Sequence, residues 1–177
     1  DVEKIDEPGG GMRVRLKEPN GYQVEIVYGI ATLDRIPVPR QAINWREERL
    51  ARPGDLMRIK KGPAHVKRIG HGVLGSPKVK ETAAWFRKNL GFICSDDVYA
   101  GPKDNIIGSF SRADCGDEYV DHHIFFCAMN ERAGLNHLSF EVEDIDDVLL
   151  GHEHLKGLGK YKHMWGIGRH VLGSQVF

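Results

Sequence analysis

The sequence predicts an α+β protein built from paired modules, each with the order strand, helix and three strands, the second module being incomplete. His71 and His137, 66 residues apart, each lie near the start of an apolar, strand-like run. A helical pattern follows each run and ends near a Leu-Gly pair, Leu90-Gly91 or Leu158-Gly159, and these pairs are 68 residues apart. The chain therefore contains an internal repeat with a histidine at the same place in each copy.

The first module, residues 64–133, starts with a strand predicted over residues 66–74. Ser76 is then a suitable N-cap, with Pro77 at the first helical position, because these residue types suit the unpaired amides of a first turn. Apolar residues recur at helical spacing as far as Gly91, a natural stop. Three further strands are predicted over residues 92–99, 106–112 and 119–128.

The second module, residues 134–177, repeats this order but stops early. Its first strand begins at Gly134, and its helix begins near Asp144. The apolar residues of this helix fall on one face, and they are Ile145, Val148, Leu149 and Leu155. Phe177 ends the chain inside an apolar run, so we expect the last strands of this module to lie outside the chain.

Residues 1–28 do not have the pattern of a domain start. Two alternating segments, residues 12–16 and 22–28, flank the turn signal Pro19-Asn20-Gly21. We therefore expect residues 1–28 to be the C-terminal hairpin of a truncated N-terminal domain, with its partner strands missing from the chain.

Residues 29–63 differ in composition from the segments on either side. They contain four prolines and a charged stretch, so we expect a connector with one short helix around residues 42–51. Residues 64–177, the two modules, then form the main domain.

The bulk composition excludes several classes of function. Lys+Arg and Asp+Glu both number 25, which argues against a nucleic-acid partner, and no apolar run is long enough to span a membrane. The three scattered cysteines form no CxxC pair and favour a cytoplasmic protein with reduced thiols. Nine histidines in a neutral chain point to metal or acid-base chemistry.

His71 and His137 are the strongest candidates for metal ligands. Paired copies of one module place equivalent residues across a pseudo-two-fold axis, where two imidazoles could hold one ion. Two histidines and a carboxylate form the facial triad of non-haem Fe(II) and leave positions open. The alternative is that both are ordinary strand residues with satisfied hydrogen bonds, and the repeat is what favours ligation.

His122 and His123 lie just before the second module, and adjacent strand residues face opposite sides of a sheet. His123 shares the parity of Phe125 and Cys127, so we expect it to face the site as a proton shuttle that does not bind the metal. A solvent-exposed pair at a sheet edge is the alternative. His170 is a weaker candidate of the same type.

Other candidates have more ordinary explanations. We expect the histidines at 152, 154 and 163 to lie on a solvated helix face and loop, and Glu25 to be structural. Cys127 is more typical of a small buried hydrophobe. Trp85 and Phe86 are expected in the helix core, and Trp165 is a candidate for a pocket wall.

Five segments follow one another along the chain in a fixed order, and they are Ile69-Gly70-His71-Gly72-Val73-Leu74, Trp85-Phe86-Arg87-Lys88-Asn89-Leu90-Gly91-Phe92, Asp121-His122-His123, Asn136-His137-Leu138-Ser139-Phe140 and Gly168-Arg169-His170. Together they resemble the type I extradiol ring-cleavage dioxygenases of the vicinal oxygen chelate superfamily, which include biphenyl-2,3-diol and catechol 2,3-dioxygenases. The resemblance covers nearly the whole chain, and the order and spacing of the segments make it specific.

The resemblance implies a role for each of four histidines. His71 and His137 match the two iron-binding histidines, His123 matches the active-site acid-base histidine, and His170 matches a histidine that contacts the substrate hydroxyl. The family's third ligand is a glutamate on the last strand, which we expect beyond residue 177. Residues 1–28 match the end of the metal-free N-terminal domain, and residues 64–177 match the catalytic domain.

The activity implied by the resemblance is extradiol cleavage of a catechol-type diol by O2 at Fe(II), in aromatic-compound catabolism. The implied partners are this small-molecule diol and O2, and the family commonly assembles as homo-oligomers. A glyoxalase-like divalent-metal lyase or isomerase of the same fold is one alternative. A non-enzymatic ligand-binding module and a purely structural domain are the others.

Overall fold

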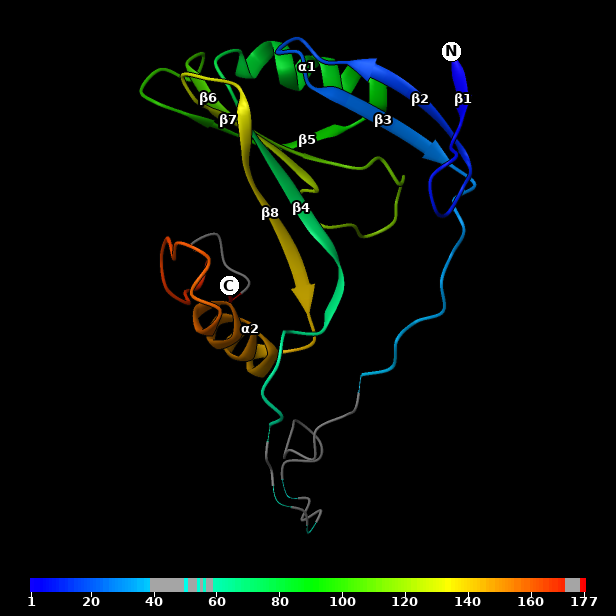
Figure 1. Cartoon of the computed structure of the whole chain (residues 1–177). Coiled ribbons are helices and arrows are strands. Elements are labelled where there is room, and N and C mark those ends of the chain that lie inside the picture. The colour runs from blue at the N-terminus through cyan, green and yellow to red at the C-terminus, as the bar shows by residue number, and fades with distance from the viewer. Residues whose placement is uncertain (39–49, 51–53, 55, 57–58, 171–175) are drawn as a thin grey trace. The chain divides into compact units, whose positions relative to one another are not determined.

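The computed structural model describes residues 1–38, 50, 54, 56, 59–170 and 176–177 (Figure 1). Its elements are β1 (Val2–Lys4), β2 (Met12–Lys17), β3 (Gln23–Tyr28), β4 (Val66–Ser76), α1 (Val79–Leu90), β5 (Ile93–Tyr99), β6 (Ile106–Arg112), β7 (Phe125–Met129), β8 (Gly134–Val142) and α2 (Ile145–Gly157). The α+β class and the order of strand, helix and three strands are confirmed. The short helix expected around residues 42–51 lies almost wholly outside the described residues.

The chain divides into two compact units. The first comprises Asp1–Asp34 and Ile69–Ser139, and the second comprises Arg35–Arg68 and Phe140–Phe177. The sequence analysis divided the chain by its internal repeat into residues 1–28, 29–63 and 64–177. The compact units are defined by contacts instead, so the predicted division stays a prediction.

The N-terminal strands form a three-stranded antiparallel sheet in the order β1-β2-β3. The hairpin of β2 and β3 is as predicted, with Val14 opposite Ile26. The expectation that its partner strands all lie outside the chain is wrong, because Val2 of β1 pairs with Val14 of β2. A strand of three residues is too short to show alternation, so the pattern did not reveal β1.

The second sheet has the order β5-β6-β7-β4-β8. Both β5 and β7 run antiparallel to β6, whereas β4 and β7 are parallel, with Leu74 opposite Cys127. The strand β8 belongs to the second copy of the repeat and lies beside β4, the equivalent strand of the first copy. This adjacency brings equivalent positions of the two copies close together.

The helix α1 begins later than the sequence predicts. Its N-cap is Lys78, without a side-chain cap, and Ser76 is the last residue of β4. The Ser76 hydroxyl does accept from the Lys78 N–H at 2.9 Å, but the backbone of Ser76 belongs to β4, and its hydroxyl also joins a buried network. The predicted stop is confirmed: Gly91 has the left-handed φ of 68° and its N–H donates to the Arg87 carbonyl.

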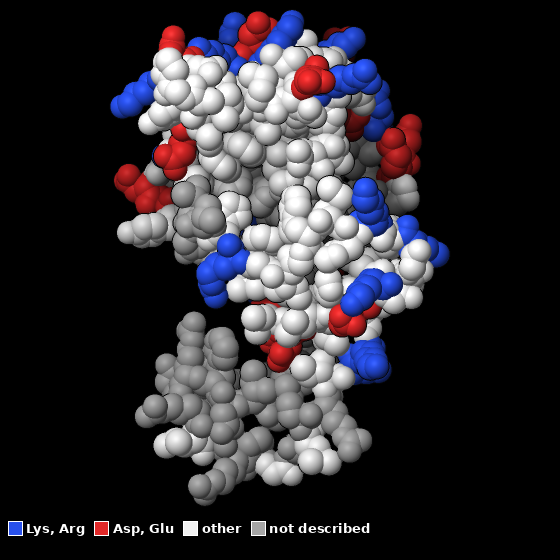
Figure 2. Space-filling model, turned by 90° about the vertical axis from the view of Figure 1, so that its left-hand side faces the viewer, with Lys and Arg blue, Asp and Glu red and all other residues white. Residues whose placement is uncertain are grey.

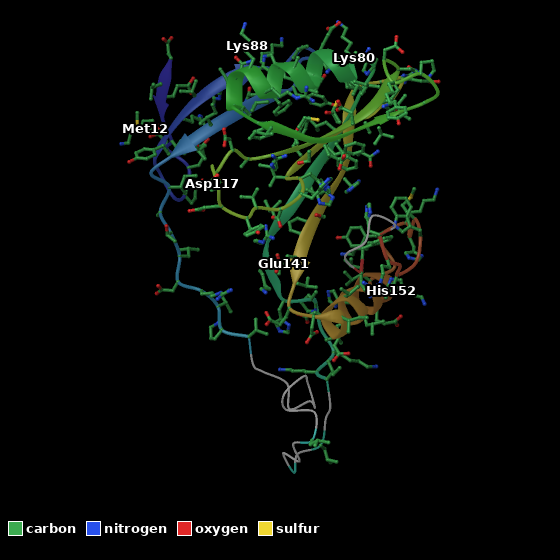
Figure 3. The ribbon with its side chains drawn as sticks, turned by 180° about the vertical axis from the view of Figure 1, so that it is seen from behind. Met12, Lys80, Lys88, Asp117, Glu141 and His152 are labelled. Carbon is green, nitrogen blue, oxygen red and sulfur yellow. The ribbon has the colours of Figure 1, made fainter. Side chains whose placement is uncertain are left out.

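The apolar side of α1 packs on the sheet. Phe86 is buried with Phe125 and Cys127 of β7, and the Phe86 and Phe125 ring centroids are 4.1 Å apart. Trp85 packs against the same cluster, so the prediction that Trp85 and Phe86 belong to the helix core is confirmed. Lys88 lies on the opposite side of the helix and points away from the sheet (Figure 3).

The two faces of the five-stranded sheet carry different residues. Leu74 and Cys127 lie opposite each other in parallel strands, and both pack in the core under α1. Since side chains alternate along a strand, Val73 and its partner Phe126 point to the other face. His71 has the same parity as Val73 and therefore lies on the face that α1 does not cover.

The helix α2 begins where the sequence predicts. Its N-cap is Asp144, whose side chain accepts from the Asp147 N–H at 3.0 Å. Asp147 is itself only 5% exposed, and its carboxylate is 2.8 Å from Nδ1 of His65. The start of the second unit's helix is therefore fixed by a cap and by a contact to His65, the residue just before β4.

Charged side chains of both signs are interspersed on the face shown in Figure 2. This mixture agrees with the zero formal charge of the sequence. Of the helices that the structure describes, none combines the length and apolar character needed to cross a membrane.

A buried hydrogen-bond network joins the turn between β2 and β3 to α1. The Thr82 hydroxyl donates to Glu18 Oε1 at 2.8 Å and lies 3.0 Å from Ser76 Oγ. The Asn20 amide donates to Thr82 Oγ1 at 2.7 Å and accepts from Ser76 Oγ at 3.1 Å. Glu18, Ser76 and Thr82 are at most 2% exposed, so these groups satisfy one another instead of water.

We expect Thr82→Val to lower the free energy of unfolding by about 1–3 kcal/mol, because it leaves the buried Glu18 carboxyl group without this donor while keeping the side-chain shape. Urea denaturation measures the change. Thr32→Val, at an exposed position of the same unit, is the matched control and should stay within about 0.5 kcal/mol of the wild type. An equal effect of the two substitutions would contradict the role of the network.

Candidate metal centre

Three histidines meet on the face of the sheet that α1 leaves uncovered. His71 lies in β4, His137 lies in β8, and His123 lies two residues before β7. Since β7 and β8 are the two neighbours of β4, these side chains come from two adjacent strands and from the segment that leads into β7. The His71 ring centroid is 4.5 Å from that of His123 and 5.4 Å from that of His137. The structure thus brings three of the four predicted site residues together within the first unit.

His71 and His137 point their outer ring nitrogens at each other. The two Nε2 atoms are 3.3 Å apart. Two imidazole nitrogens bound about 2.1 Å from one ion lie about 3.0 Å apart in octahedral geometry and about 3.4 Å apart in tetrahedral geometry. The observed distance therefore suits two adjacent ligands of one ion.

Each of these rings is held by its other nitrogen. His137 Nδ1 lies 2.8 Å from Asn136 Oδ1, which only accepts hydrogen bonds, so Nδ1 carries the proton. His71 Nδ1 lies 2.9 Å from Ser139 Oγ, which also accepts from the His71 backbone N–H at 3.0 Å. The lone pair of His137 therefore resides on Nε2, and the Ser139 hydroxyl can also accept the Nδ1 proton of His71, which leaves the His71 Nε2 lone pair available to a metal. Histidines that bind metals commonly have such a partner on the second nitrogen.

Ser139 reaches His71 because residue 70 is glycine. A Cβ atom at Gly70 would lie 2.6 Å from Ser139 Oγ, which is closer than these atoms can approach. The glycine before His71 therefore has a specific role, since it leaves room for the hydroxyl that holds the ring. Ser139 and Asn136 both lie in the sequence segment around His137, but the sequence alone did not assign them a function.

The facing nitrogens of the pair can bind a cation. The two Nε2 atoms, 3.3 Å apart, share one proton as a hydrogen bond, or each directs a lone pair at a positive charge between them. A divalent metal ion supplies that charge, and neutral imidazole is a common metal ligand. Among the residues that the structure describes, no group of three His, Cys, Asp or Glu side chains is arranged to hold a metal. The described residues therefore offer two ligands of this kind.

His122 and His123 do not lie in a strand, so the prediction of a strand over residues 119–128 is wrong at its start. β7 begins at Phe125, because its pairing with β6 starts only there, opposite Ser111. Strand alternation therefore does not turn the two histidines to opposite faces of the sheet, and their Nδ1 atoms are 3.1 Å apart. His122 Nε2 lies 2.7 Å from Asp96 Oδ2, a partner that no sequence pattern indicated.

The remaining histidine candidates lie in the second unit. The His170 ring centroid is 6.2 Å from that of Phe177, and a substrate contact by His170 stays a prediction. The ring centroids of His152 in α2 and His163 are 4.9 Å apart, a contact that the sequence pattern did not predict. Trp165 is 65% exposed, which does not favour its expected place in a pocket wall.

Glu25 and Cys127 are structural, as predicted. Glu25 accepts from Arg15 Nε at 2.9 Å, and this hydrogen bond is the main reason why the pKa of the Glu25 carboxyl is lowered. Cys127 is fully buried in the core under α1, and burial raises the pKa of its thiol to about 11.

The sequence comparisons identify one curated relative. No family model matches the chain. The chain is 32% identical over 111 residues to metapyrocatechase 2 of Cupriavidus necator, and the match covers 63% of this chain and 32% of the relative. The chain thus spans about a third of the length of this relative.

Several solved structures share the fold. The Mn(II)-bound glyoxalase from Novosphingobium aromaticivorans has a TM-score of 0.73 at 23% identity, covering 100% of this chain and 48% of its own. The 2,3-dioxygenase LapB from Pseudomonas sp. KL28 has a TM-score of 0.64 at 20% identity, covering 97% and 55%. Homoprotocatechuate 2,3-dioxygenase from Arthrobacter globiformis has a TM-score of 0.58 at 17% identity, covering 90% and 42%.

These comparisons confirm two predictions. The fold is that of the vicinal oxygen chelate proteins, which the glyoxalase and the dioxygenases share. The resemblance to extradiol dioxygenases is confirmed by the sequence match to a metapyrocatechase. The chain spans about half the length of the solved structures.

The burial of Cys127 predicts a large difference in thiol reactivity. At pH 8 the Cys127 group stays protonated, because its pKa of about 11 lies well above the pH, and it is closed to solvent. The exposed Cys115 should react with Ellman's reagent at least about tenfold faster under native conditions. All three thiols should react in concentrated guanidinium, and equal native rates for Cys115 and Cys127 would contradict the assignment.

Proposed function

We propose that this protein cleaves the ring of a catechol-type diol with O2 in the extradiol manner, at a non-haem Fe(II) centre, in aromatic-compound catabolism. The observation that carries the proposal is the pair of Nε2 atoms of His71 and His137, 3.3 Å apart, with the His123 ring beside them. The sequence match to metapyrocatechase, a catechol 2,3-dioxygenase, supports the same chemistry.

The two facing nitrogens fit a divalent metal of this class. His71 and His137 would hold it through Nε2, and a carboxylate outside the described residues would complete the facial triad. Fe(II) bound there supplies redox chemistry and open positions for the diol oxygens and for O2. Zn(II) would suit the same nitrogens but has no redox chemistry, which is why we propose Fe(II).

His123 is placed to move a proton beside the metal ligands. Its ring centroid is 4.5 Å from that of His71, while its Nδ1 faces His122. The other ring nitrogen of His123, Nε2, would accept the proton of a substrate hydroxyl and later return it to an oxygen of the product. Imidazole suits both steps, because its ordinary pKa lies near neutral pH.

Aromatic side chains border the histidines and favour a planar substrate. The Phe110 ring centroid is 4.8 Å from that of His123 and 4.0 Å from that of Phe126, on which it stacks. Phe110 is only 9% exposed, so its ring is held firmly. An aromatic diol would meet ring faces and edges here.

A glyoxalase-like lyase or isomerase is the second candidate. The observation in its favour is the likeness in fold to a Mn(II)-bound glyoxalase over 100% of this chain. Such an enzyme would use the same two histidines with a divalent ion, but would not consume oxygen. Oxygen uptake therefore separates the two candidates.

We expect the full natural protein, loaded with Fe(II) under anaerobic conditions, to consume one O2 for each catechol cleaved. An oxygen electrode measures the uptake, and the yellow ring-opened product is followed by its absorbance. Zn(II)-loaded protein is the control and should consume none, since zinc transfers no electrons. Iron-loaded protein that leaves a panel of catechols and O2 unchanged would rule out the proposed reaction.

Two substitutions separate metal binding from proton transfer. His137→Ala should lower iron content by at least about tenfold, because it removes one of the two imidazole ligands. His123→Ala should keep iron bound but slow turnover by about 10²–10⁴-fold, the usual contribution of a general acid or base. Metal analysis and single-turnover kinetics give the two readouts.

His154→Ala in α2 is the matched control for these variants. It removes an imidazole outside the first unit and should change neither iron content nor turnover. Loss of iron from the His123→Ala variant would assign His123 as a ligand and contradict its proton-transfer role. Full iron content in the His137→Ala variant would exclude that residue from the centre.

A further inference from the structure

Two residues outside the metal centre hold the ring of His123. The Nδ1 atoms of His123 and His122 are 3.1 Å apart, and His122 Nε2 is 2.7 Å from Asp96 Oδ2. A carboxylate, an imidazole and a second imidazole therefore form a continuous chain of hydrogen bonds. This hydrogen-bond chain ends at the His123 ring, whose centroid is 4.5 Å from that of His71.

Residues of β5 and β6 hold His122 in its place in this hydrogen-bond chain. The pairing of β5 with β6 shifts register between Cys94 and Asp96, which is an irregularity of the kind that re-aims side chains near active sites. Ser95, at the shift, donates to the His122 carbonyl, while Arg112 donates to Ser95 Oγ at 3.0 Å. The backbone and the ring of His122 are thus both held from β5.

The chain of partners decides which nitrogen of His123 carries a proton when both rings are neutral. A carboxylate only accepts hydrogen bonds, so the proton of His122 lies on Nε2, toward Asp96. Nδ1 of His122 is then an acceptor, and Nδ1 of His123 must be the donor. The lone pair of His123 consequently resides on Nε2, the nitrogen that would meet a substrate proton.

We propose that Asp96 and His122 are positioning residues that fix the orientation and the tautomer of His123. The proposal rests on the proposed function for its consequence in catalysis, but the tautomer itself can be measured without turnover. Neither residue touches the reacting atoms. They act through His123, in the way that a buried carboxylate sets the tautomer of a catalytic histidine in hydrolases.

The first experiment measures the tautomer in the 177-residue chain. Two-bond proton–nitrogen NMR spectra near pH 8, about 1.5 units above the ordinary histidine pKa, separate the two neutral forms. We expect His123 to be protonated on Nδ1 in the wild type and to change toward the Nε2 form in His122→Phe. Wild-type His123 protonated mainly on Nε2 would overturn the proposal.

The second experiment uses Asp96→Ala in the iron-loaded protein with a catechol. Asp96 and His122 side chains are 65% and 48% exposed, so the fold does not depend on their contact. We expect kcat to fall about tenfold or more, the usual effect of an outer partner of an active-site ring, with KM and iron content within about twofold. Asp96→Glu, which keeps the acceptor, should recover most of the rate.

Asp104→Ala is the matched control, because it removes the same charge from the turn between β5 and β6. It should leave kcat unchanged. A kcat of Asp96→Ala equal to that of this control would overturn the positioning role. If the wild-type protein cleaves no catechol, the proposed function fails, and the NMR measurement still decides the assignment of Asp96 and His122.

Discussion

The site depends on one constraint, which is that the Nε2 atoms of His71 and His137 face each other at 3.3 Å. The inner nitrogen of each ring is engaged, that of His137 by Asn136 and that of His71 by Ser139. Because Asn136 Oδ1 only accepts, His137 directs a lone pair toward His71, while the Ser139 hydroxyl allows His71 either to donate to that lone pair or to present one of its own. Both rings are therefore oriented by the protein, and a cation between them would replace the hydrogen bond that they share.

Much of the fold follows from the sequence because its signals are local. Alternation gives the strands, helical spacing gives α1 and α2, and the glycine after Leu90 gives the helix end, all of which the structure contains. The failures have different causes. β1 is too short to show alternation. The hydroxyl of Ser76 is shared with Asn20, which is 56 positions away, and with Thr82 in the helix itself.

The closeness of His71 and His137 was predictable because the repeat makes them equivalent, and adjacency of the two first strands brings equivalent residues together. The residues that hold these rings were not predictable in the same way. Ser139 acts on His71 across 68 positions, and Asp96 acts on His122 across 26. Such contacts depend on strand register and on a local shift in β5, and no short pattern in the sequence encodes either of them.

Register is also what makes the site precise. A slip of β8 by one residue along β4 would turn the His137 side chain to the other face of the sheet. Only in the observed register can Ser139 Oγ accept from the His71 backbone N–H and meet its Nδ1, and only glycine at position 70 leaves space for that hydroxyl. The contact that aims the His71 ring therefore also selects the strand register, so correct pairing of the two copies also brings the proposed metal ligands together.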